Sequence, residues 1–115
     1  MDAETRSSMW RIVEGAFADD KVPLGTPFPI AMMVAVKNEA AIPQVRGELA
    51  RAGFEVASVD KKWWPFGRRW ELAVKSQAPR PIDPAQIDPL LDRLDAALMP
   101  YDATVLTWVP LRPGA

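Results

Sequence analysis

The residues best suited to chemistry in this chain lie in a short aromatic and cationic segment, residues 61–70. Three of the five tryptophans are found there, together with four cations and no carboxylate. Trp and Arg side chains dominate binding hot spots because each buries a large rigid area while keeping a polar group for a partner. We therefore predict a protein-binding surface made of the following side chains: Lys61, Lys62, Trp63, Trp64, Phe66, Arg68 and Arg69.

Catalytic chemistry has far less support in the sequence. The chain contains no histidine and no cysteine, which excludes Ser-His and Cys-His nucleophile pairs, an imidazole general base and the common zinc-binding sets. The pair Asp19-Asp20 is typical of a loop, and Asp92 with Asp95 is typical of the solvated face of a helix. The glycines never fall into a phosphate-binding spacing. We therefore expect no enzymatic activity, no metal and no cofactor.

Length and charge limit the kind of partner. The 115 residues suffice for one domain, and a formal net charge of −1 argues against general binding to polyanions. The acidic N-terminus lacks the cationic start and apolar run of a secretory signal, and no stretch has the length and apolarity of a membrane span. We expect a cytoplasmic protein without a membrane partner, and a homodimer is left open.

The aromatic and cationic segment joins two strand-like runs of a longer pattern. An almost unbroken apolar run at residues 28–36 is typical of a central strand that is covered on both faces. Residues 41–52 carry apolar side chains at helical spacing and are followed by Gly53, which favours the end of a helix. Further strands are predicted at residues 54–59, 70–75 and 103–109.

A proline-rich stretch precedes the last helix. Asp83-Pro84 and Asp88-Pro89 both have the pattern of a capping Asp followed by proline at the first helical position. Because a proline inside a helix costs about 3 kcal/mol, we expect a short turn from Pro84 and the main helix from Pro89 to Met99. The predicted core stripe of that helix is Leu90, Leu91, Leu94 and Leu98.

The order strand, helix, strand, strand, helix, strand predicts an α+β fold, a ferredoxin-like βαββαβ sandwich with an additional N-terminal helix. Residues 1–27 would form this helix, over residues 7–17, and a linker. Residues 28–110 would form the ferredoxin-like domain, and residues 111–115 a disordered tail. One sheet face would be covered by the two helices. The other would carry Met33, Ala35, Leu106 and Trp108, shielded by the N-terminal segment, a second copy or a partner.

Two short motifs add a resemblance to a known family. A Gly-Phe-Glu-Val run at residues 53–56 follows the first helix, and the leucine-rich second helix leads to Tyr101-Asp102. Together with the order of elements, these motifs resemble the ribonuclease E inhibitor family RraB over residues 28–108. The resemblance implies a small cytoplasmic protein of ferredoxin-like fold that acts through protein contact, as a regulator of an RNA-processing enzyme.

Three other interpretations stay open. The same topology occurs in RNA-recognition modules, in which exposed aromatics stack on bases, and the aromatic and cationic segment would then bind RNA. A dimer of such sheets would enclose a small-ligand cavity or a cofactor-free oxygenase site, lined by Met32, Met33 and Trp108. In the third interpretation, the aromatic side chains at positions 63, 64 and 66 pack onto the N-terminal helix as a purely structural cluster.

Overall fold

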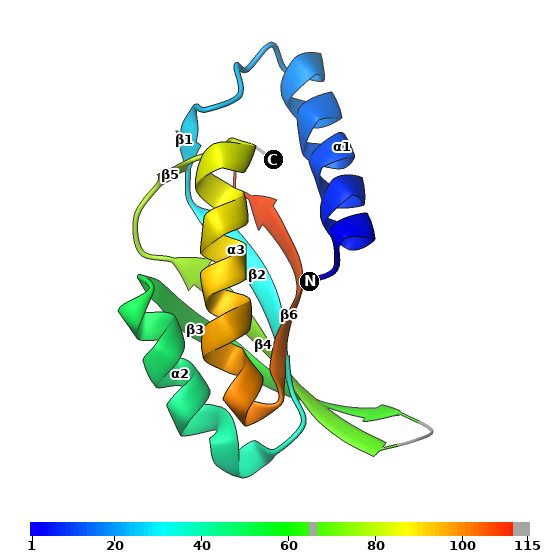
Figure 1. Ribbon diagram of the computed structural model, residues 1–115, viewed down its shortest axis with the longest axis vertical. Coiled ribbons are helices and arrows are strands. Elements are labelled where there is room, and N and C mark those ends of the chain that lie inside the picture. The colour runs from blue at the N-terminus through cyan, green and yellow to red at the C-terminus, as the bar shows by residue number, and fades with distance from the viewer. Residues whose placement is uncertain (65–66, 112–115) are drawn as a thin grey trace.

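The computed structural model describes residues 1–64 and 67–111, apart from the side chain of Trp64. These residues form three α-helices and two antiparallel sheets (Figure 1). The helices are α1 (Ala3–Asp19), α2 (Ile42–Arg51) and α3 (Pro84–Leu98), with short 3-10 helices η1 at Glu39–Ala41 and η2 at Met99–Tyr101. The strands are β1 (Pro27–Phe28), β2 (Ile30–Val36), β3 (Phe54–Trp64), β4 (Gly67–Ser76), β5 (Arg80–Pro81) and β6 (Ala103–Pro110).

The larger sheet has the strand order β3-β4-β2-β6, and every neighbouring pair is antiparallel. Helices α2 and α3 lie side by side on one of its faces (Figure 1). β1 and β5 pair with each other in a separate two-stranded sheet. The single strand expected over residues 28–36 is therefore divided at Pro29, which has no backbone N–H to donate to a ladder. Only the second part enters the larger sheet.

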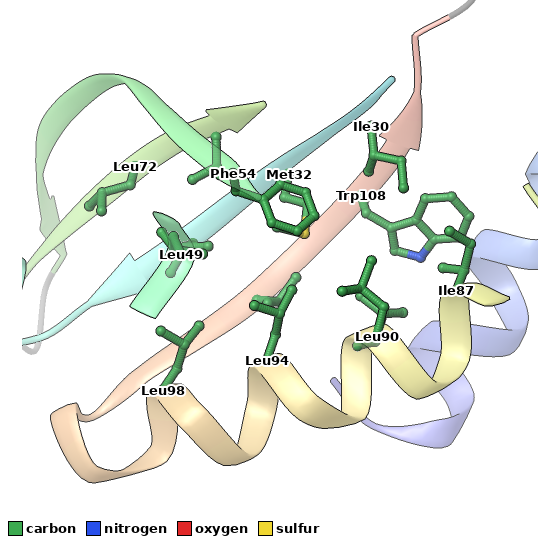
Figure 2. Packing of buried hydrophobic residues seen from close by; sticks show 14 of the residues in the cluster. Ile30, Met32, Leu49, Phe54, Leu72, Ile87, Leu90, Leu94, Leu98 and Trp108 are labelled. Atoms are coloured by element: carbon green, nitrogen blue, oxygen red, sulfur yellow. The ribbon is translucent and has the colours of Figure 1, made fainter. Parts of the chain in front are cut away.

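The core lies between this face of the sheet and the two helices. Alternate residues of β2 point toward the helices and are buried: Ile30, Met32, Val34 and Val36. The leucines of α3 point toward the sheet from the other side (Figure 2). Burial of each such side chain stabilises the fold by roughly 1.5–3 kcal/mol. The predicted leucine stripe of the last helix is confirmed, since all four of its members are buried.

The helix α3 is continuous from Pro84, with Pro89 in its interior. Asp83 caps it by accepting a hydrogen bond from the backbone N–H of Gln86 at 2.9 Å. The prediction of a main helix beginning at Pro89 was wrong because Ile87, in the additional turn, is buried with the leucines. Burial of this side chain offsets a large part of the cost of an internal proline, which is about 3 kcal/mol.

The predicted N-terminal helix is confirmed and is longer than expected. Asp2 caps α1 by accepting a hydrogen bond from the backbone N–H of Thr5 at 2.7 Å, and this bond lowers the pKa of the Asp2 carboxyl. Trp10, Val13 and Phe17 are buried in the same core as the leucines of α3. Because α1 lies along β6, it extends the helical layer at that edge of the sheet (Figure 1).

One tryptophan lies on the sheet face opposite to the expected one. β6 contains a bulge at Leu106, a residue that is skipped in the register between β6 and β2. The extra residue reverses the alternation of side chains along the strand, so Trp108 faces the helices and is fully buried. Its ring meets the ring of Trp10 edge-on, with the centroids 5.0 Å apart. The expectation that Trp108 belongs to the face without helices was wrong.

Candidate functional site

The described residues of the predicted binding segment, 61–64 and 67–70, lie at the end of the β3-β4 hairpin that projects beyond the rest of the sheet (Figure 1). The last residue of β2, Val36, pairs with Trp70. Farther toward the tip, the register continues between β3 and β4, past the end of β2. We call residues 61–64 and 67–70 the hairpin arm. Its position beyond the helical layer leaves its described side chains largely accessible to a partner.

One face of the hairpin arm alternates between cations and indoles. Cross-strand neighbours share a face of an antiparallel ladder, which places Trp63 and Arg68 on the same side as Lys61. The ammonium nitrogen of Lys61 lies 4.8 Å from the centroid of the Trp63 ring, and the guanidinium carbon of Arg68 lies 4.7 Å from it. Both distances permit cation–π attraction. Two cations therefore hold the indole of Trp63 in place while the residue remains 69% exposed.

The other face of the hairpin arm carries two cations that oppose each other. Lys62 pairs with Arg69 across the ladder, and like charges placed directly opposite are destabilising. The Arg69 guanidinium donates a hydrogen bond of 2.8 Å to the carboxylate of Glu71, which compensates part of this charge. Lys62 is exposed. An anionic group of a partner would relieve the remaining repulsion.

The hairpin arm brings together the predicted cations and Trp63. Phe66 lies outside the described residues, as does the side chain of Trp64, whose backbone belongs to β3. The interpretation in which the aromatics pack onto the N-terminal helix is wrong for Trp63, because this residue is exposed and α1 lies along β6. Trp70 is half-buried against the core and connects the arm to the domain.

The carboxylates of α3 hold the N-terminal helix. Asp92 accepts a hydrogen bond of 2.9 Å from the Arg6 guanidinium, and Asp95 lies 3.7 Å from the same group. Asp88 accepts a hydrogen bond of 2.9 Å from the indole Nε1–H of Trp10. The expectation that Asp92 and Asp95 form only a solvated helix face was therefore incomplete, since both take part in packing α1 against α3.

The other carboxylate pair lies at the end of α1. Asp19 is the last residue of that helix and Asp20 is its C-cap, so the expected loop position is wrong for Asp19. Both side chains are exposed. Within residues 1–64 and 67–111, no group of three or more carboxylates is placed to hold a metal ion.

A second surface lies on the sheet face opposite α2 and α3, and sequence analysis identified it only in part. A trough of about 360 Å³ crosses this face. Met33 was expected on this face, and Ala31 was expected on the same side of its strand, whereas the contributions of Ala73 and Val109 were missed. Its main lining side chains are small or apolar: Ala31, Met33, Ala73, Thr107, Val109 and Leu111.

The cavity expected between Met32, Met33 and Trp108 does not exist as a single site. Met32 and Trp108 pair across the ladder, and both side chains are buried on the helix side of the sheet. Met33 is half-buried on the opposite side. Neighbours in a strand face opposite ways, so only Met33 contributes its side chain to the trough.

Comparison with other proteins leaves the geometry as the basis for function. No known protein-family model matches the chain, and a search of curated proteins gives no match. No helix in the described part of the chain is long and apolar enough to cross a membrane.

Proposed function

We propose that this protein is a small non-catalytic regulator that binds another protein through the hairpin arm. The observation that supports this most strongly is the exposure of Trp63, which is 69% accessible and lies beside two cations. An indole buries on the order of 150–250 Å² at a contact. Covering the exposed part of this ring is therefore worth roughly 3 kcal/mol to a complex.

The cations beside the indole favour binding in two ways. Lys61 and Arg68 restrict the ring before a partner arrives, which lowers the conformational entropy lost on association. Both also keep N–H donors for a partner, and the planar guanidinium of Arg68 suits a carboxylate that binds through two oxygens. The expected partner surface is therefore apolar where it meets the indole and acidic around that point.

The fold proposed as the base of the hairpin arm is a ferredoxin-like sandwich. The element order β2-α2-β3-β4-α3-β6 and the antiparallel strand order β3-β4-β2-β6 support this assignment. In such a domain the helices stiffen one face of the sheet, and the long β3-β4 hairpin at its edge is free to carry the contact residues.

The narrower form of the proposal is an inhibitor of an RNA-processing enzyme in the cytoplasm, in the manner of the RraB family. The two motifs of the resemblance support the shared fold. Phe54 is buried, and Asp102 adopts a left-handed backbone with φ of 52° where the chain enters β6. Both residues have structural roles in the domain. Recognition of a particular enzyme would therefore be made by the hairpin arm.

RNA binding is a second candidate, favoured by the same exposed indole, because an aromatic ring flanked by cations can stack on a base beside its phosphates. Protein binding has the stronger support. On the open faces of β2 and β4, the described residues near the trough are Ala31, Met33, Ala73 and Lys75, and none of these is aromatic. RNA-recognition modules need stacking rings at such central positions.

Affinity capture from an extract of the source cells tests the proposal. The baits are the wild-type protein, Trp63→Ala and Ile12→Ala. Ile12 lies on α1 and is 68% exposed, which makes its substitution a matched control for removing an exposed apolar side chain. We expect wild type and Ile12→Ala to capture the same protein, with or without nuclease, and Trp63→Ala to lose it.

The other outcomes are equally informative. Equal capture by all three baits would contradict the proposal, and capture that disappears after nuclease treatment would replace it with RNA binding. Circular dichroism and thermal unfolding of the Trp63→Ala bait provide the control for folding. If that bait has lost stability along with its partner, Trp63 has a structural role instead.

A further inference from the structure

A cleft of about 420 Å³ lies between α2 and α3, the two helices that run side by side over the sheet (Figure 1). Its volume is in the range of sites that hold a small molecule. The buried side chains of Leu90 and Leu94 give it an apolar part. The charged side chains that line it come from three separate elements of the fold: Glu48 and Arg51 of α2, Arg80 of β5 and Arg93 of α3.

Arg80 is fixed in place by the end of α2 and the start of β3. Its guanidinium donates a hydrogen bond to the backbone carbonyl of Ala52, the C-cap of α2, and its carbon lies 5.2 Å from the centroid of the Phe54 ring. Gly53 has a φ of 87°, and a Cβ at this position would lie only 2.9 Å from the guanidinium. The bond to Ala52 uses one of five N–H donors. Arg80 is therefore a positioned cation with further donors for a ligand.

The charges of α3 are divided between its two sides. Asp88, Asp92 and Asp95 all interact with side chains of α1. Arg93 is the one cation of this helix, and it lines the cleft on the side of α2. It is exposed, and its guanidinium is in no ion pair with residues 1–64 or 67–111. The carboxylates of α3 are thus engaged elsewhere, and its guanidinium is left for the cleft.

The cleft has more positive than negative charge. Glu48 is its one carboxylate among the described lining residues, and it accepts a hydrogen bond of 2.7 Å from Arg51. Three guanidiniums and one carboxylate leave an excess of two positive charges. Solvent screens these charges only in part, because the apolar floor and the walls of a cleft concentrate the field. The lining therefore suits a ligand that combines a doubly negative group with an apolar part.

We propose that this cleft binds a small phosphate monoester, with the phosphate against Arg80 and Arg93 and the apolar part against Leu90 and Leu94. A phosphate monoester carries a charge of about −1.5 to −2 at neutral pH and has three strong acceptor oxygens. Guanidiniums bind such a group through paired N–H donors. A single carboxylate would neutralise only half of the excess charge, and inorganic phosphate would leave the apolar part of the cleft uncovered.

NMR titration of the ¹⁵N-labelled full chain with phenyl phosphate tests the class of ligand. We expect saturable shifts of backbone amides around the cleft, at residues 48–53 and 90–97. Phenol and inorganic phosphate should each bind at least about fivefold more weakly, because each lacks one half of the proposed ligand. Absence of shifts up to about 10 mM phenyl phosphate would overturn the proposal, as would equal affinity for either of the two comparison compounds.

Substitution of Arg93 tests the site. Arg93→Gln should weaken binding of phenyl phosphate by at least about fivefold, whereas Arg46→Gln should leave it unchanged. Arg46 is an exposed arginine of α2 outside the cleft lining, so it is a matched control for the loss of one surface cation. Arg93 is the better choice than Arg80, because Arg80 also holds the end of α2. Equal binding by Arg93→Gln and Arg46→Gln would overturn the site.

Trp63→Ala separates this cleft from the hairpin arm. The variant should bind phenyl phosphate as tightly as wild type, because Trp63 lies at the far end of the β3-β4 hairpin. Loss of binding in this variant would place the probe on the hairpin arm and overturn the assignment to the cleft. Failure of the cleft to bind phenyl phosphate leaves protein capture by the hairpin arm untouched, so the two proposals stand or fall separately.

Discussion

Two regions of this protein use tryptophan in opposite ways. At the β6 edge, Trp10 and Trp108 meet edge-on, and the indole Nε1–H of Trp10 donates to Asp88. Trp108 has no exposed surface. In the hairpin arm, Trp63 is 69% exposed, and its ring is held by cations from its own hairpin. The first region has a carboxylate and apolar neighbours, whereas the ring of the second lies against the two cations Lys61 and Arg68.

Coverage by the helical layer decides the role of an indole in this fold. The helical layer covers β6 because α1 extends that layer along it, and there the large apolar area of tryptophan stabilises the domain. Strands β3 and β4 continue past the end of β2 and past the helices. A ring at that position buries little apolar surface when the chain folds, so most of its surface stays available to a partner.

The largest predicted effect comes from the buried pair. Trp108→Ala should lower the free energy of unfolding by about 3–5 kcal/mol, because it removes a fully buried ring and leaves a cavity beside Trp10. Urea denaturation followed by circular dichroism measures this. A loss below about 1 kcal/mol would mean that the two regions do not differ as described.

An intermediate effect is expected where α1 meets α3. Asp88→Ala leaves the indole N–H of Trp10 without its acceptor and should lower the free energy of unfolding by about 1–2 kcal/mol. Asp88→Asn keeps an acceptor oxygen at the same place and should cost less. Thermal unfolding of the two variants beside wild type provides the comparison, and equal stability of all three would show that this hydrogen bond contributes nothing.

A smaller effect is expected from the cations of the hairpin arm. Arg68→Ala removes one of the two cations over Trp63 and should change the free energy of unfolding by only about 0.5–1 kcal/mol. Iodide quenching of tryptophan fluorescence is a more sensitive readout, because the cation attracts iodide to an exposed ring. We expect weaker iodide quenching in Arg68→Ala than in wild type. Unchanged quenching would argue against the observed placement of the guanidinium.

The sequence predicted the elements well where one physical signal dominates. The apolar run of β2 and the leucines of α3 identify a strand and a helix by period alone, and the composition of residues 61–70 identifies an unusual hairpin. These predictions succeed because burial on one face leaves a pattern that does not depend on distant parts of the chain.

The remaining features depend on tertiary contacts. The local sequence pattern of β6 does not indicate the bulge at Leu106. This one extra residue places Trp108 on the helix side of the sheet, opposite to the face that simple alternation predicts. Pro89 has the local signature of a helix start, and the burial of Ile87 in the core overrides it. The exposure of Trp63 likewise depends on where β2 ends. The residues next to Trp63 in the sequence do not determine that end point.

The most direct test of the account measures folding and binding on the same sample of Trp63→Ala. The account predicts a free energy of unfolding within about 0.5 kcal/mol of wild type, together with complete loss of the captured protein. A variant that unfolds more easily by several kcal/mol, or one that still captures its partner, would contradict it.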